Sequence, residues 1–148
     1  LSIDPYVGWP SGKEAALHAI ERAGFAEHHR LIQERSDTAL PQLLEEGLSP
    51  GLGYIDGDHS YEGALHDFFY LDKLIPEGGI LAFNDAGWIP VYRVIRHLQR
   101  QKRYMEMDVG LTPNYQGRNA LYSLARRILG ISRQDRYFRK RKKDGDHP

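Results

Sequence analysis

Short apolar runs alternate with segments of helical periodicity along this chain of 148 residues, and three of those runs end in an aspartate. The three acids are Asp4, Asp56 and Asp85. Alternation of this kind predicts βαβ units and a mostly parallel sheet. Because ligands bind where the carboxyl ends of parallel strands meet, we expect these aspartates to lie side by side and to frame one cavity.

The expected elements follow from the spacing of apolar residues and from the turn residues between them. Glycine or proline turns bound most of these segments, for example at Gly24, Gly47 and 76–79. The fold class is therefore α/β, and we interpret residues 1–130 as one domain. Helices are expected over 13–23, 37–46, 61–74 and 91–101, and strands over 2–5, 29–33, 53–56, 80–83, 103–108 and 120–126.

A net charge of zero conceals an asymmetry between the two ends of the chain. Residues 1–117 carry 10 Lys and Arg against 17 Asp and Glu, whereas residues 118–148 carry 10 against 3. The basic excess is greatest over 136–143. Such a run either contacts a polyanion or is a solvated, frayed end. We expect a flexible basic tail over 131–148 and no dedicated nucleic-acid site.

Composition excludes several classes of protein. The chain has no cysteine, so disulfides, thiolate metal sites and cysteine nucleophiles are ruled out. No apolar run is long enough to cross a bilayer, and no signal peptide opens the sequence. We therefore expect a cytoplasmic protein.

Two carboxylates and an imidazole follow one predicted strand within four residues, at Asp56, Asp58 and His59. Gly57 allows the sharp turn that aims the two carboxylates at one space. Clustered carboxylates suit a hard cation such as Mg²⁺. The alternative is structural: Asp58 caps the helix that begins near Tyr61, and Asp56 simply ends the strand.

The next strand delivers Asn84 and Asp85 to the same predicted edge, where both side chains offer oxygen ligands to Mg²⁺. A helix cap is the alternative here too. Asp4 resembles the acid that hydrogen-bonds a ribose in nucleotide-binding units, although Asp-Pro is also an ordinary turn.

The segment 55–63, read with the turn 76–79 and with residues 2–5, resembles class I S-adenosylmethionine-dependent methyltransferases. The likeness is greatest to bacterial small-molecule and sugar O-methyltransferases of the macrocin and novobiocin type, and it covers about 1–108. It implies a Rossmann-like, doubly wound sheet with a C-terminal antiparallel strand pair. In that fold a first strand and a glycine-rich loop precede the acid at position 4, so the resemblance implies N-terminal truncation.

The resemblance also assigns roles to individual residues. It implies methyl transfer from S-adenosylmethionine to a hydroxyl of a small molecule or sugar, assisted by a divalent metal. Two other functions stay open, a metal-dependent glycosyltransferase with the Asp56-Gly57-Asp58 pattern and a non-catalytic domain with a polyanion-binding tail. The implied roles are Asp58 as the catalytic base with His59 as the alternative base, Asp4, Ser36, Asp37 and Asp56 at the cofactor, and Asp56, Asn84 and Asp85 at the metal.

Overall fold

A computed structural model describes residues 1–148 except 9, 112–120, 122–123, 125–127, 129–133 and 143–148. The chain divides into two compact units, Leu1–Gln42 and Leu43–Pro148. Within the described residues no helix combines the length and the apolar character needed to cross a membrane.

The first unit is a βαβ unit, as the alternating pattern predicts. Strand β1 pairs in parallel with β2, and α1 and the short 3₁₀ helix η1 connect them. Helix α1 ends at Arg22, and Gly24, with a positive φ of 76°, then turns the chain so that the Phe25 N–H bonds the Ile20 carbonyl at 3.1 Å. The elements are β1 (Ser2–Ile3), α1 (Pro10–Arg22), η1 (Ala26–His28), β2 (Leu31–Ile32) and α2 (Ser36–Glu45), whose last turn lies beyond the unit boundary.

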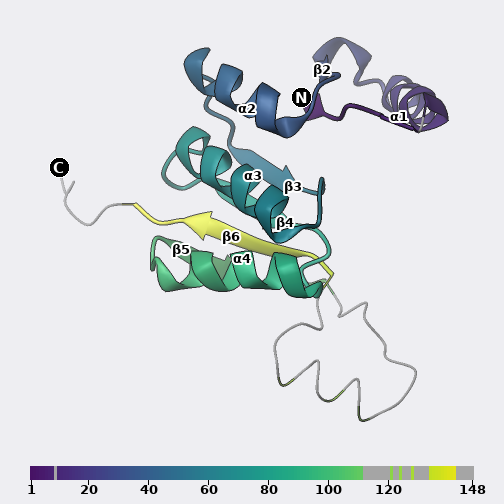
Figure 1. The fold of residues 1–148 in the computed structure, drawn as a ribbon. Coiled ribbons are helices and arrows are strands. Elements are labelled where there is room, and N and C mark those ends of the chain that lie inside the picture. Colours follow the sequence, from purple (N-terminus) through teal and green to yellow (C-terminus); the bar gives the residue numbers. More distant parts are fainter. Residues whose placement is uncertain (9, 112–120, 122–123, 125–127, 129–133, 143–148) are drawn as a thin grey trace. The chain divides into compact units, whose positions relative to one another are not determined.

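The second unit contains a four-stranded sheet in the order β3-β4-β6-β5 (Figure 1). Strands β3 and β4 are parallel, and β6 runs antiparallel to both of its neighbours. The structure confirms the α/β fold and an antiparallel pair at the C-terminal side of the sheet, but β3 and β4 form the one parallel pairing of these four strands, and the last strand comes from the segment expected to be a tail rather than from 120–126. The strands are β3 (Leu52–Ile55), β4 (Ile80–Phe83), β5 (Tyr104–Met107) and β6 (Arg136–Lys140).

Helices α3 (Tyr61–Leu74) and α4 (Ile89–Arg100) lie side by side over one face of this sheet (Figure 1). Alternate strand residues point toward them, because successive side chains of a strand face opposite sides. Burying each large side chain of this core contributes about 1.5–3 kcal/mol. The core comprises Ile55, Ala64, Phe68, Ile75, Leu81, Phe83, Ala86, Val91, Val94, Ile95, Leu98, Tyr104 and Phe138.

Strand β6 differs from the expectation of a flexible basic tail over 131–148. It lies between β4 and β5, with Phe138 fully in the core and Arg136 only 7% exposed. The fold tolerates the buried Arg136 guanidinium because this group donates two hydrogen bonds to the Glu106 carboxylate, of 2.8 and 2.6 Å. The pairing of this segment within the sheet, rather than its basic composition, therefore determines how exposed it is. The predicted strand 120–126 lies mostly outside the described residues.

Candidate active site

The carboxyl ends of β3 and β4 lie next to each other because the strands are parallel and Ile55 is in register with Phe83. Asp56 follows Ile55, and Asn84 and Asp85 follow Phe83. The Asn84 amide donates to the Asp56 carboxylate at 2.5 Å. The structure thus brings together the polar residues expected at these two strand ends. We use the name acidic rim for Asp56, Asn84, Asp85 and the neighbouring His59.

His59 faces both carboxylates of the acidic rim. Its Nε2 atom lies 3.4 Å from Asp85 Oδ2 and 3.8 Å from Asp56 Oδ1. This nitrogen is buried, yet it forms no hydrogen bond within the described residues. Buried polar atoms are nearly always hydrogen-bonded in native proteins. The nitrogen is therefore unsatisfied in this structure, a state that a bound water, ion or ligand hydroxyl would relieve.

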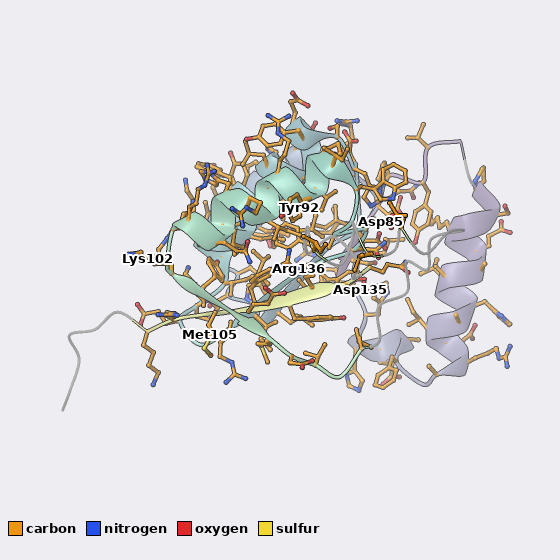
Figure 2. All side chains as sticks on the ribbon, turned by 90° about the horizontal axis from the view of Figure 1, so that it is seen from below. Asp85, Tyr92, Lys102, Met105, Asp135 and Arg136 are labelled. Atoms are coloured by element: carbon orange, nitrogen blue, oxygen red, sulfur yellow. The ribbon has the colours of Figure 1, made fainter. Side chains whose placement is uncertain are left out.

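Asp85 sits in a strained backbone conformation, with a φ of 46°. The left-handed region costs a non-glycine residue about 1–2 kcal/mol, and such strain concentrates at functional sites. The neighbouring backbone holds it there: Trp88 N–H donates to the Asp85 carbonyl, and Ala86 N–H to the Gln134 carbonyl, both at 2.8 Å. Figure 2 shows Asp85 near the end of β6 where Asp135 and Arg136 lie.

Asp58 is engaged with the start of α3. Its Oδ1 accepts from the Ser60 N–H and its Oδ2 from the Ser60 hydroxyl, each at 2.9 Å. Ser60 is the N-cap and accepts from the Gly63 N–H at 3.0 Å. A Cβ at Gly63 would lie 2.8 Å from the Asp58 Cβ, so glycine is needed for this approach. Asp58 therefore orients the cap and is not itself the capping residue.

Tyr54 and Asp135 form a contact near this rim that the sequence does not indicate. The Tyr54 hydroxyl donates to Asp135 Oδ1 at 2.5 Å. Burial raises the pKa of Tyr54, and the hydrogen bond to Asp135 raises it further. The two residues are 81 positions apart, so no local pattern reveals the pair.

The predicted cofactor residues Asp4, Ser36 and Asp37 belong to the first unit. Asp4 Oδ1 accepts from the Tyr6 N–H at 2.7 Å, which is the Asp-Pro turn considered as an alternative. Ser36 is the first residue of α2, and Asp37 forms an ion pair with Arg35 at 2.8 Å. Their roles at a cofactor stay predictions.

Whether the predicted metal ligands suit a divalent cation depends on the donor atoms that they offer. Within the described part of the chain, no group of three or more His, Cys, Asp or Glu side chains is arranged to hold a metal ion. The predicted set, Asp56, Asn84 and Asp85, contains only two carboxylates and is completed by an amide. Turning the Asn84 amide about its last bond exchanges its nitrogen for its oxygen. The set would then offer three oxygen donors, the type of ligand that a hard cation prefers.

Comparison with solved structures places the fold among methyltransferases. The apo structure of CalS11, a TDP-rhamnose 3'-O-methyltransferase of calicheamicin biosynthesis, matches with a TM-score of 0.58 and 18% identity over 97% of this chain and 57% of that chain. Another crystal structure of the calicheamicin methyltransferase CalS11 gives 0.56 and 18% identity, over 95% and 48%. This chain thus spans about half the length of those structures. At this identity the likeness shows the fold alone.

The sequence comparisons complete the assignment. A search among curated proteins finds no match. A family described as a methyltransferase domain matches residues 1–86, which is more than half of the chain. This match and the structural likeness confirm the predicted class I, Rossmann-like fold. The chain therefore belongs to the methyltransferase domain family, whose cofactor is expected to be S-adenosylmethionine.

Proposed function

We propose that the protein containing this chain transfers a methyl group from S-adenosylmethionine to a sugar hydroxyl. The observation that carries the proposal is the convergence of Asp56, His59 and Asp85 within 4 Å at adjoining strand ends of a methyltransferase domain. Methyl transfer to a hydroxyl requires a group that removes a proton and a framework that orients the oxygen. The acidic rim offers both.

His59 is the better candidate for the base. Its Nε2 forms no hydrogen bond within the described residues, whereas both carboxylate oxygens of Asp58 already accept hydrogen bonds from Ser60. Ser60 thereby fixes the Asp58 carboxylate against the start of α3, although each of its oxygens keeps a lone pair. In this proposal His59 accepts the hydroxyl proton and Asp85 stabilises the resulting imidazolium, while Asp58 positions the loop.

Asp56, Asn84 and Asp85 are the residues that would hold a divalent cation. When bound, Mg²⁺ lowers the pKa of a coordinated hydroxyl and fixes its orientation. The support is the oxygen-rich donor set and the contact between Asn84 and Asp56. Asp56 also stays a candidate for contact with the cofactor.

The sugar acceptor is proposed from the structural relative, whose title names TDP-rhamnose as its substrate. The family match favours methyl transfer over the glycosyltransferase interpretation of Asp56-Gly57-Asp58. The polyanion-binding tail loses support over β6, because Arg136 is paired with Glu106 and Lys140 donates to the carbonyls of Asp72 and Ile75.

The test measures transfer of the labelled methyl group of S-adenosylmethionine to TDP-rhamnose by the whole protein. Replacing the base in His59→Ala is expected to lower kcat by about 10²–10⁴-fold, the usual contribution of a general base. Asp85→Ala is expected to remove the part of the activity that chelator abolishes and Mg²⁺ restores. Asp108→Ala, at an exposed acid after β5, is the matched control and should leave activity unchanged.

The outcomes separate the parts of the proposal. S-adenosylhomocysteine at a hundredfold excess over its Kd should stabilise the fold by about 2.7 kcal/mol, and no stabilisation would contradict the cofactor assignment. Full activity in excess chelator would remove the metal and leave the methyltransferase intact. Stabilisation by a nucleotide sugar alone, without any by S-adenosylhomocysteine, would favour the glycosyltransferase.

A further inference from the structure

Trp88 occupies a position where it contributes little to the fold. It is the N-cap of α4, where its side chain makes no capping hydrogen bond. Ser, Thr, Asp or Asn at an N-cap stabilises a helix by about 1 kcal/mol over residues that cannot cap. The indole is also 52% exposed, so it adds only part of the burial that a core tryptophan provides. A residue that neither caps nor fills the core invites a functional explanation.

The backbone holds Trp88 in a fixed place relative to Asp85. The Trp88 N–H donates to the Asp85 carbonyl, and the Trp88 carbonyl accepts from Tyr92 N–H, both at 2.8 Å. The buried stripe of α4 begins with Val91 and continues with Ile95, at helical spacing from Trp88. Trp88 therefore extends the apolar stripe of the helix up to the acidic rim.

The indole lies beside the proposed base. The ring centroids of Trp88 and His59 are 5.5 Å apart with an interplanar angle of 39°. His59 Nε2 is in turn 3.4 Å from the Asp85 carboxylate. An exposed aromatic side chain thus borders a group of charged and polar side chains.

We propose that Trp88 is a specificity-determining residue that stacks on the C–H face of the acceptor sugar. This inference rests on the proposed function. One face of a pyranose is rich in C–H groups and loses little on leaving water, while its hydroxyls need polar partners. Stacking on the indole leaves the hydroxyls at the ring edge to the acidic rim, which is the orientation that methyl transfer needs.

The test compares Trp88→Ala, Trp88→Phe and the wild-type protein in the TDP-rhamnose assay. Loss of the stacking surface is expected to raise KM for TDP-rhamnose about tenfold in Trp88→Ala, with kcat within about threefold and KM for S-adenosylmethionine unchanged. Trp88→Phe keeps an aromatic face and should recover most of the affinity. Phe69→Ala is the matched control, because Phe69 is a 50% exposed aromatic on α3 away from the acidic rim.

Fluorescence gives a second readout that does not depend on turnover. The emission of Trp88, taken as the difference between wild type and Trp88→Phe, should change on adding TDP-rhamnose and not on adding TDP alone or catechol. An equal change with TDP alone would place the nucleotide, not the sugar, on the indole. An equal change with catechol would favour a planar phenol as acceptor. Either result overturns the inference.

The kinetic outcomes keep this inference apart from the proposed function. A wild-type protein that transfers no methyl group to TDP-rhamnose would defeat the proposed function for this acceptor, and the inference with it. A wild-type protein that transfers the group, with Trp88→Ala retaining the wild-type KM, would defeat the inference alone. A parallel rise in KM for S-adenosylmethionine would show general damage to the site and would also overturn it.

Discussion

Replacing Glu106 by glutamine should destabilise the protein strongly, although Glu106 lies far from the acidic rim along the chain. The Arg136 side chain is 7% exposed and forms a fork with Glu106, with Nε to Oε1 at 2.8 Å and Nη2 to Oε2 at 2.6 Å. Glu106→Gln keeps the size of the side chain and one acceptor. It removes the negative charge and one of the two charge-assisted hydrogen bonds, and it leaves the buried guanidinium without a counter-charge.

The expected loss follows from these contacts. Removing one partner of a buried ion pair costs about 3–5 kcal/mol, and one hydrogen bond to a charged group contributes about 1.5–3 kcal/mol. The Glu106 side chain is 31% exposed, so water reaches the pair and partly solvates the charge left behind. We therefore expect the free energy of unfolding to fall by about 2–3 kcal/mol.

Guanidinium denaturation of the whole protein, followed by circular dichroism, measures this change as a lower midpoint at an unchanged slope. A cycle with Arg136→Met isolates the pair, and a coupling of at least about 1 kcal/mol is expected. Arg139→Gln is the control, because Arg139 is an exposed arginine of the same strand and should cost less than about 0.5 kcal/mol. If Glu106→Gln lowered the free energy of unfolding by less than about 0.5 kcal/mol, the reasoning would be refuted.

Two further predictions concern the stability of the second unit. Ser60→Ala should lower the free energy of unfolding by about 1 kcal/mol, because the Gly63 N–H loses its acceptor, and a thermal melt unchanged from wild type would contradict the capping role. Burial raises the pKa of Tyr104 above its ordinary value of 10.0, and its hydrogen bond to Asp72 raises it further. The folded protein then retains a proton that the unfolded chain releases, so stability should decline as the pH rises above about 10. Tyr104→Phe should reduce this decline, and an identical pH dependence in both proteins would argue against it.

Much of the fold could be predicted from local patterns. Helix α3 has the predicted bounds 61–74 and β4 the predicted bounds 80–83, because turn residues delimit both segments sharply. Helix α4 begins at Ile89, two residues before its predicted start at 91. Trp88 as its N-cap is not one of the residue types that mark a helix start, so the sequence gives no boundary signal there.

Strand β6 was not predictable in the same way. It has only one fully buried apolar residue, Phe138, set among arginines and lysines. Its pairing with β4 and β5 connects residues that are 30 or more positions apart, which a local pattern cannot report. Arg136 and Lys140 lie within the sheet because Glu106 and the carbonyls at the end of α3 satisfy them. Local charge therefore describes the composition of this segment and does not determine its exposure.

The location of the acidic rim could be predicted from the sequence, but the roles of its individual residues could not. Parallel pairing of β3 with β4 follows from the βαβ pattern, and it is sufficient to bring Asp56 next to Asn84 and Asp85. Asp58 and His59 are neighbours in the same loop, so sequence alone allows either to be the base. His59 is proposed here because Ser60 holds the Asp58 carboxylate at the start of α3, whereas His59 Nε2 faces Asp85. This proposal thus depends on how the cap of α3 is built, which is a property of loop geometry rather than of residue type.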